Sequence, residues 1–327
     1  MKARWPRLLG DIGGTHARWA WQEAPGRTIA SYASYACADF ASVQAVIEQY
    51  LRDMRLPRPA RLAFGIATPV TGDRVRMTNH AWSFSVAELQ QALGVERCVV
   101  LNDFAAIAAA LPALGAGDLR RVGGGEAVAG APMAVLGPGT GLGVAALVRS
   151  GPAGTDAGAP LAIEGEGGHV TLAATSAREA DVLAVLRERF GHVSAERAVS
   201  GPGLQNLYRA VCALDALAAH ELAPADVSER GLAGTDPACA EALQLFAGFL
   251  GNVAGNLALT LGARGGVFIG GGIVPRLGAA FDTLPFRERF EAKGRFRGYL
   301  ERIPTLVITA AAPGLAGAAD ALDRLPD

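Results

Sequence analysis

The chain has 327 residues with a formal net charge of −1, and 50% of its residues are hydrophobic while 19% are charged. These values predict a globular protein with room for two α/β lobes of roughly 150 residues each. No block of basic residues occurs, so a nucleic-acid or anionic-membrane partner is not expected. The cysteines form no CxxC pair, which disfavours a disulfide framework or zinc knuckle and favours a reducing, cytoplasmic compartment.

The first segment with a clear pattern is RLLGDIGGTHARWAW, Arg7–Trp21, in which glycines end an apolar run. It lacks the Gly-Lys-Ser/Thr of a Walker loop and also lacks G-x-G-x-x-G, and the residues after the glycines are extended rather than helical. The pattern predicts a strand, a Gly-Gly turn and a second strand. A hairpin tip without Cβ atoms lets backbone N–H groups converge on phosphate oxygens, although a plain hairpin turn is the alternative.

The rest of the chain alternates β-rich runs with helical patterns, which predicts an α/β fold with largely parallel sheets. Helices are expected at FASVQAVIEQYLRDM, VAELQQAL, DFAAIAAAL and SAREADVLAVLRERF, the last starting with Ser176 and Glu179 at capping-box spacing. Strands are expected at Leu62–Thr68, Arg97–Asn102, Met133–Gly139, Gly265–Gly271 and Thr305–Ala310.

A second strand, glycine turn and strand occurs at AVLGPGTGLGVAALV, Ala134–Val148. This repeat of the first pattern predicts an internal duplication, with one such hairpin early in each lobe. Two glycine turns facing each other across a cleft could hold the phosphates of one nucleotide. Asp11 beside the first turn would repel phosphate unless a cation stood between them, and Mg²⁺ suits that position. The alternative is an aspartate that stabilises its own turn.

The stretch from Ala242 to Ala263 carries no charge and is long enough to span a bilayer. Asn252 and Asn256 lie in its middle, and glycines dilute its apolar character. A helix buried in the protein core is therefore the preferred interpretation.

Four further places carry polar groups suited to chemistry. Asn102 and Asp103 stand where a strand ends and a helix begins, a usual ligand position, with a simple N-cap as the alternative. Glu166 and His169 flank two glycines and suit a polyhydroxylated ligand, with a solvated loop as the alternative. Glu196, taken alone, fits a surface ion pair. His80, beside Asn79 and Trp82, belongs to a polar and aromatic cluster, and Gly270–Gly272 forms a third glycine turn.

Taken together, these stretches resemble a known family. LLGDIGGTHAR, TGDRVRMTNHAWSFS, VVLNDFAA, GPGTGLGVA and EGEGGHV are followed in order by GHVSAERAVSGPGLQNLY, GGGIVPR and FEAKGRFRGYLERIPT, from about Leu8 to about Ala319. They resemble the bacterial ATP-dependent glucokinases of the hexokinase and actin-like superfamily. GDIGGT alone is typical of the superfamily, whereas LND, EGGH and HVSAER together are specific to the glucokinase branch.

The resemblance implies an actin-like (ribonuclease H-like) α/β fold of two lobes with an active-site cleft between them. The small lobe would comprise residues 1–113 and 304–327, and the large lobe residues 114–303. The implied cofactors are ATP and Mg²⁺, and the implied assembly is a cytoplasmic homodimer. The implied reaction transfers the γ-phosphoryl group of ATP to the 6-hydroxyl of D-glucose, which admits glucose to glycolysis.

The roles of single residues follow from the same resemblance. Asp103 would be the catalytic base, and Asn102, Asp103, Glu166, His169 and Glu196 would bind the glucose hydroxyls. Asp11 would hold Mg²⁺ through water. The nucleotide phosphates would be bound by Gly10, Asp11, Ile12, Gly13, Gly14 and Thr15, by Gly139, Thr140 and Gly141, and by Gly271.

The sequence departs from the family pattern at two places. His16 stands where the family usually has Asn, and EGEGGHV lacks the preceding Pro or Ser. The zinc-binding cysteines of the related ROK sugar kinases are absent, which argues against that branch. The alternative functions are a kinase for another hexose or an amino sugar and an actin-like or Hsp70-like ATPase. A sugar-sensing repressor would need a helix-turn-helix before the first glycine turn, where this sequence leaves no room.

Overall fold

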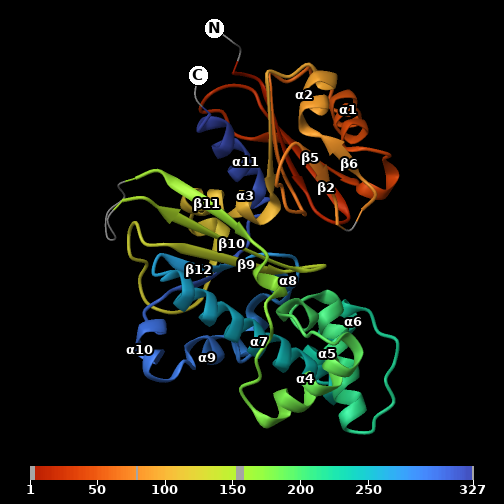
Figure 1. Ribbon diagram of the computed structural model, residues 1–327, viewed down its shortest axis with the longest axis vertical. Helices are drawn as coiled ribbons and strands as arrows, with labels where there is room; N and C mark the ends of the chain where they lie inside the picture. The colour runs from red at the N-terminus through yellow and green to blue at the C-terminus, as the bar shows by residue number, and fades with distance from the viewer. Residues whose placement is uncertain (1–3, 79, 152–157, 326–327) are drawn as a thin grey trace. The chain divides into compact units, whose positions relative to one another are not determined.

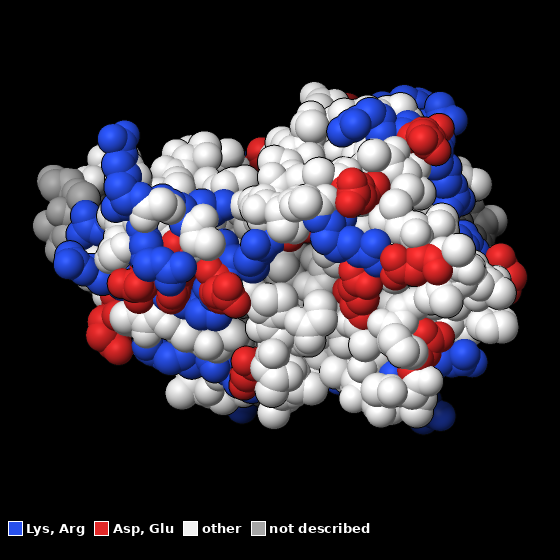
Figure 2. All heavy atoms as spheres, turned by 90° about the horizontal axis from the view of Figure 1, so that it is seen from below, with Lys and Arg blue, Asp and Glu red and all other residues white. Residues whose placement is uncertain are grey.

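The computed structural model describes residues 4–78, 80–151 and 158–325. The chain divides into two compact units. The first comprises Met1–Gly115, Leu161–Glu164 and Ala310–Asp327, and the second comprises Ala116–Pro160 and Gly165–Thr309. Each unit contains a large sheet with helices against it (Figure 1). On the face that Figure 2 shows, Lys and Arg side chains lie interspersed with Asp and Glu side chains, as the net charge of −1 leads one to expect.

The sheet of the first unit has the strand order β3-β2-β1-β4-β7. Strands β1 (Arg7–Ile12) and β2 (His16–Gln22) pair antiparallel, so the first glycine segment is the hairpin that its sequence predicts. Strand β3 (Ala30–Ala36) pairs antiparallel with β2. Strands β4 (Arg61–Ile66) and β7 (Arg97–Asn102) run parallel to β1, which brings the carboxyl ends of three strands to one edge.

Alternate side chains of these strands are buried on opposite faces of the sheet, because successive residues of a strand point to opposite sides. Leu8 and Leu62 belong to the core shared with α1 (Val43–Asp53) and α2 (Val86–Leu93). Leu9 and Ala63 belong to the core shared with α11 (Pro313–Asp323).

Helix α3 (Asp103–Ala110) lies beside α11 in the first unit (Figure 1). The two helices approach backbone to backbone, because a Cβ at Gly317 of α11 would overlap the carbonyl oxygen of Ala106. The small residues of both helices therefore serve close packing, and this contact fixes the helix that begins at Asp103.

The second unit repeats the topology of the first. Its sheet has the order β11-β10-β9-β12-β13-β8, in which β9 pairs antiparallel with β10 and parallel with β12. The middle of the edge strand β11, Leu161–Glu164, is the segment counted with the first unit. The order β11-β10-β9-β12-β13 matches β3-β2-β1-β4-β7, and β8 is an additional edge strand. The directions of β10, β12 and β13 relative to β9 match those of β2, β4 and β7 relative to β1, which supports the predicted duplication. The strands are β8 (Leu119–Gly123), β9 (Met133–Pro138), β10 (Leu142–Arg149), β11 (Pro160–Gly165), β12 (Gly266–Ile269) and β13 (Thr305–Ile308).

The place where the chain returns to the first unit differs from the predicted one. The sequence analysis assigns residues 304–327 to the small lobe, but β13 pairs with β12 and β8 in the sheet of the second unit. The return comes at Ala310, and the first boundary lies after Gly115 rather than after residue 113. The sheet hydrogen bonds of β13 are the reason for the difference.

Helix α7 (Pro237–Leu261) is the helix of the uncharged stretch, and it packs against α5 (Gly201–Leu214), α6 (Pro224–Ala233) and α9 (Phe286–Glu291). Among the described residues it is the one helix long and apolar enough to cross a membrane, and 72% of its most apolar window is buried. This burial agrees with the preferred interpretation of a core helix. Asn252 and Asn256, the two asparagines within this helix, both accept hydrogen bonds from Lys293. The distance from Lys293 Nζ to Asn256 Oδ1 is 2.7 Å.

Local capping signals define several helix starts. Ser42 and Ser85 each accept a hydrogen bond of 3.1 Å from the backbone N–H three residues later, at the starts of α1 and α2. Ser176 does the same for α4 (Ala177–Phe190), but the predicted capping box is only half formed. The Glu179 carboxylate accepts instead from Thr175 and pairs with Arg289. The remaining elements are β5 (Arg74–Arg76), β6 (Ser83–Ser85), α8 (Ile273–Leu277) and α10 (Arg297–Leu300).

Candidate active site

The turn between β1 and β2 is formed by Gly13, Gly14 and Thr15. Gly13 N donates to His16 O at 2.9 Å, which closes the turn, and Cys37 N donates to Thr15 O at 2.8 Å. His16 is exposed, and its Nδ1 lies 3.1 Å from Thr15 Oγ1. The departure from the family pattern at position 16 therefore places an imidazole directly against the turn.

Gly10 and Ile12, which the sequence analysis includes in the first phosphate loop, belong to strand β1. A Cβ at Gly10 would overlap the Trp19 ring, so this glycine makes room for an aromatic side chain. Ile12 is fully buried in the core. The side-chain positions of Gly10 and Ile12 therefore serve packing within the strand.

Asp11 lies at the carboxyl end of β1 with its side chain 15% exposed. Arg18 Nη1 donates to Asp11 Oδ2 at 3.2 Å, and among the described residues this guanidinium, rather than a backbone N–H of the turn, is its hydrogen-bond partner. Burial raises the pKa of Asp11, and the charge and hydrogen bond of Arg18 oppose that rise. The alternative of an aspartate that caps its own turn is therefore not what the structure shows.

The first turn of α11 also approaches this carboxylate. A Cβ at Gly314 would lie 3.3 Å from Asp11 Oδ1, so only a glycine leaves this approach open without displacement. The electropositive N-terminus of a helix favours an ionised carboxylate. The sequence analysis missed Arg18 and Gly314. The hairpin register, which pairs position 11 with position 18, was the signal that could have identified Arg18.

The hydrogen bonds at the start of α3 show which of Asn102 and Asp103 is the N-cap. Asn102 is the N-cap of α3, and its Oδ1 accepts from Phe104 N at 3.0 Å and from Ala105 N at 3.1 Å. Its Nδ2 donates to Thr68 O at 3.4 Å. Asp103 is the first helical residue, half-buried, and its Oδ1 accepts from Phe104 N at 2.9 Å. The cap is therefore the asparagine, which leaves the aspartate carboxylate at the helix N-terminus.

The strand register brings Asp11, Asn102 and Asp103 to the same edge of the first unit. Ile12, Ile66 and Asn102 are register partners across β1, β4 and β7. Ligands of parallel sheets bind outside the carboxyl ends of the strands. The first unit therefore gathers two carboxylates and one carboxamide at the edge where such chemistry is expected.

The turn between β9 and β10 is formed by Gly139, Thr140 and Gly141 in the second unit. Gly139 N donates to Gly141 O at 2.8 Å, and Gly139 O accepts from Gly201 N, at the start of α5, at 2.8 Å. Thr140 is exposed at the tip. The turn is thus anchored on one side by the first residue of a helix.

Glu196 lies against this turn rather than in a surface ion pair. It belongs to a short 3₁₀ turn, Ala195–Arg197, and its Oε2 accepts from Leu142 N at 2.9 Å. A Cβ at Gly141 would overlap the same carboxylate oxygen, which explains a glycine there. The resemblance placed Glu196 in the site, and the structure gives it a contact with the second glycine turn that composition did not suggest.

Glu166 directly precedes a second 3₁₀ turn, Gly167–His169, and His169 is the last residue of that turn, which packs on β10. A Cβ at Gly168 would overlap Leu142 O, and one at Gly167 would lie 2.9 Å from Val144, so both glycines serve close packing. His169 Nε2 and Glu166 Oε2 are 3.8 Å apart with both side chains about 60% exposed. Glu166, His169 and Glu196 are therefore all positioned by β10.

The third glycine turn packs on the end of β9. Gly270 N donates to Leu136 O at 2.8 Å. Gly271 has φ of +76°, and a Cβ there would overlap Pro138 O. Its position thus needs glycine both for backbone conformation and for space, next to the strand that leads into the second turn.

His80 and Trp82 form an edge-to-face pair with ring centroids 4.7 Å apart. Trp82 is buried and its Nε1 donates to Phe40 O at 2.9 Å, which marks it as a core residue. Among the described residues, His80 Nδ1 has no hydrogen-bond partner. Asn79, the third member of the predicted cluster, lies outside the described residues.

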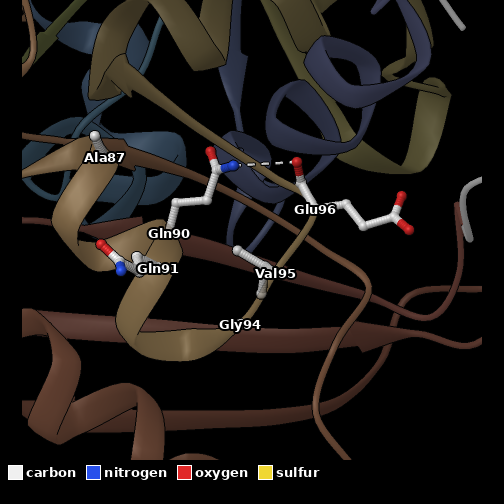
Figure 3. A pocket seen from close by; sticks show the side chains of 6 residues that line it. All are labelled: Ala87, Gln90, Gln91, Gly94, Val95 and Glu96. Carbon is white, nitrogen blue, oxygen red and sulfur yellow. Dashed lines mark hydrogen bonds between the residues drawn. The ribbon is translucent and has the colours of Figure 1, made fainter.

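A pocket of about 410 Å³ lies at the end of α2 (Figure 3). Gln90 crosses it, donating to Glu96 O at 3.1 Å and accepting from Cys98 N at 3.2 Å, so it ties α2 to β7. In Figure 3 the Glu96 carboxylate points away from Gln90. The pocket is lined by Ala87, Gln90, Gln91, Gly94, Val95 and Glu96, and contains none of the predicted site residues.

Known proteins that are similar to this chain in sequence identify its family. The glucokinase family model matches residues 8–325. A glucokinase of Aromatoleum aromaticum is 56% identical over 98% of this chain and 95% of its own length. One of Chromobacterium violaceum is 51% identical over 96% of this chain and 88% of its own.

Two solved structures extend the comparison to the fold. A glucokinase from an Antarctic psychrotroph has a TM-score of 0.86 and 37% identity, and the match covers 98% of this chain and 99% of that one. A ROK-family glucokinase of Streptomyces griseus, solved with glucose and AMPPNP, has a TM-score of 0.65 at 21% identity over 97% of this chain and 99% of its own. The predicted α/β sugar-kinase fold is thus confirmed, and the chain belongs to the glucokinase family.

Proposed function

We propose that the protein transfers the γ-phosphoryl group of ATP to the 6-hydroxyl of D-glucose, giving glucose 6-phosphate and ADP. The observation that carries this proposal is the edge of the first unit where Asp103 stands beside Asn102 and Asp11, in a chain of the glucokinase family. The substrate named by the relatives supports glucose, and the ATP analogue in the Streptomyces griseus structure supports ATP.

Asp103 is proposed as the general base. A sugar hydroxyl is a poor nucleophile at neutral pH, so a carboxylate must accept its proton as the new P–O bond forms. Asp103 is the first residue of α3, at the carboxyl end of β7 where ligands of parallel sheets bind. Such a base contributes roughly 10²–10⁴ in rate, and positioning supplies much of the rest.

The two glycine turns are proposed to bind the nucleotide phosphates through their backbone N–H groups. Oxygen ligands suit Mg²⁺, and Asp11 fits because Oδ2 is engaged by Arg18 while Oδ1 remains for a hydrated cation. The residues proposed for phosphate are Gly13, Gly14, Thr15, Gly139, Thr140, Gly141 and Gly271. When bound, Mg²⁺ would neutralise phosphoryl charge.

Glucose is proposed to bind through Asn102, Glu166, His169 and Glu196. Carboxylates accept hydrogen bonds from hydroxyl groups, and an imidazole both donates and accepts. A sugar that lacks a matched hydroxyl would leave one of these groups unpaired, which gives discrimination between hexoses. The side chains of Glu166 and His169 are both exposed and therefore accessible to such a ligand.

The test of the base is Asp103→Ala, with Asp181→Asn on the exposed side of α4 as a control. We expect kcat for glucose phosphorylation to fall by about 10²-fold or more in the first variant and to stay unchanged in the second. A kcat within about tenfold of the unmodified enzyme would show that Asp103 is not the base.

Two experiments distinguish the proposed glucose kinase from the alternative activities: a panel of sugar substrates and variants of the proposed sugar site. A coupled assay for ADP over a panel of hexoses and amino sugars tests whether glucose is the preferred acceptor. An ATPase of the actin or Hsp70 kind would keep its ATP hydrolysis after Glu166→Gln and His169→Ala, whereas glucose phosphorylation would fall. We further infer a homodimer in the cytoplasm acting at the start of glycolysis, and sedimentation velocity tests the dimer.

A further inference from the structure

Three arginines form a row across the first unit at the edge opposite the candidate site. Arg7, Arg61 and Arg97 are the first residues of β1, β4 and β7, and they are register partners on neighbouring strands. Register partners on parallel strands project to the same face of a sheet. Arg7 is four residues before Asp11 on the same strand, so the row lies at the amino edge while the proposed chemistry lies at the carboxyl edge.

Two members of this arginine row are buried. Arg7 is 2% exposed and Arg61 is 5% exposed, whereas Arg97 is exposed. Charged residues are almost never buried unless they are paired. Arg7 has such compensation, because its Nη1 lies 2.7 Å from Asp323 Oδ1 and its guanidinium stacks 3.9 Å from the Trp5 ring.

Arg61, in the centre of the row, lacks comparable compensation. Nε and Nη1 are buried without a hydrogen-bond partner among the described residues in both Arg7 and Arg61, but Arg7 has in addition the Asp323 carboxylate and the Trp5 ring. Burial and the charges of Arg4 and Arg7 lower the pKa of Arg61, with Arg97 acting in the same direction and Glu96 opposing them. A guanidinium stays charged in proteins, so a buried cation with unused donors remains at this position.

Arginine charges predominate among the described groups that act on Arg61. Arg4, Arg7 and Arg97 lower its pKa, and Glu96 alone raises it. The end of α11 at Asp323 contributes a favourable dipole for cations, but a dipole does not fill the free Arg61 donors. Water could occupy these donors, but an anion would also offset the charge of the buried guanidinium.

We propose that the arginine row binds a small dianionic oxyanion, phosphate or a phosphate monoester, at the amino edge of the first sheet. The planar guanidinium presents paired N–H groups that match phosphate oxygens two at a time. An oxyanion would offset positive charge of the row and would offer acceptors to the Arg61 guanidinium, whose Nε and Nη1 have no hydrogen-bond partner among the described residues. The row is separate from the proposed phosphoryl transfer and does not depend on it.

The thermal test compares the chain with two variants, Arg61→Met and Arg52→Met. Arg52 is 62% exposed on α1, outside the row, and is the matched control. Sodium phosphate is compared with sodium chloride at equal ionic strength, without sugar or nucleotide. We expect phosphate to raise Tm by about 2–4 °C more in the unmodified chain and in Arg52→Met than in Arg61→Met. Phosphate bound elsewhere would contribute equally to all three proteins.

The behaviour in chloride supplies a second readout. Replacing a buried, unpaired cation by an apolar residue should leave Tm unchanged or raise it. If Arg61 instead serves to pair Glu96, Arg61→Met would lower Tm in both salts by the same amount, and the proposal would fail. Should Arg61→Met not fold, Arg97→Met, whose side chain is exposed, is expected to lose part of the phosphate-dependent shift.

A crystal soaked in selenate locates the anion directly by anomalous scattering. We expect a peak within hydrogen-bond distance of Arg61, and its absence, together with equal phosphate shifts in all variants, would overturn the proposal. Replacing inorganic phosphate by glucose 6-phosphate in the thermal test shows whether the row prefers the free ion or the ester. The kcat of Arg61→Met for glucose phosphorylation is expected to stay unchanged, so the row and the proposed kinase site are tested independently.

Discussion

Asp11 and Arg18 face each other as register partners in the first hairpin, with Arg18 Nη1 3.2 Å from Asp11 Oδ2. The carboxylate is largely buried, while the guanidinium is 45% exposed. The arginine thus holds a carboxylate that the protein interior disfavours in its charged form. At the proposed cation position, burial therefore opposes ionisation of Asp11, and Arg18 within the same hairpin favours it.

The substitution Asp11→Asn is expected to raise the stability of the protein at neutral pH and to lower its activity. A carboxyl whose pKa is raised on folding contributes stability below its unfolded-state pKa, here 3.8, and that contribution is lost as the pH rises through its folded-state pKa. The variant should therefore unfold at higher urea concentration than the unmodified chain at pH 7.5, with the difference shrinking toward pH 4. Glucose phosphorylation should fall by about 10²-fold, because the proposed Mg²⁺ ligand is lost.

A control for that experiment is Arg18→Met, which removes the group that opposes the rise in the Asp11 pKa. Its acid limb of activity should move to higher pH, because the carboxyl then protonates more readily. If Asp11→Asn were less stable than the unmodified chain at pH 7.5, burial would not be the dominant influence on the Asp11 pKa.

Glu196 offers a pair of variants that separate loop support from sugar binding. In Glu196→Gln the amide oxygen can still accept from Leu142 N, so Tm should stay close to that of the unmodified chain. Glu196→Ala leaves that N–H without its partner and should cost about 1–3 kcal/mol of unfolding free energy. Both variants should raise the KM for glucose, since both lose a charged acceptor. A normal KM in Glu196→Gln would remove this residue from the sugar site.

Asn102 combines a helix cap with a proposed sugar contact. Asn102→Ala should destabilise the protein by about 1 kcal/mol through loss of the α3 cap, whereas Asn102→Asp retains a capping oxygen. The aspartate variant lacks the amide donor, so its KM for glucose should rise about tenfold or more while stability is kept.

The matched control for this pair is Ser42→Ala, which removes the N-cap of α1 far along the chain from α3. It should lower stability by a similar amount and leave the KM for glucose unchanged. If Asn102→Asp binds glucose normally, the side chain acts only as a cap.

Local patterns were sufficient to predict the elements. Both glycine hairpins, strand β7 with its bounds at Arg97 and Asn102, and the helix starting near Asp103 follow from residues adjacent in the chain. The repeated hairpin also predicted the duplication that the two sheet orders support. These features depend on alternation, glycine and caps, which act over a few residues.

Two features could not be predicted from local sequence patterns: the residue that caps α3, and the sheet to which β13 belongs. Asn102 and Asp103 are equally good caps by composition, and only the observed hydrogen bonds assign the cap to Asn102. Strand β13 was predicted correctly as an element but placed in the wrong unit, because its neighbours β12 and β8 are distant in sequence.

By itself, then, the sequence determined the α/β alternation, the glycine turns and, through resemblance, the family and its set of polar residues. Tertiary structure alone decided that Gly314 approaches Asp11, that Glu196 binds the turn at Leu142, and that Arg7, Arg61 and Arg97 lie in register. The physical reason is that periodicity and capping are local, whereas strand register and helix packing bring together residues dozens to hundreds of positions apart.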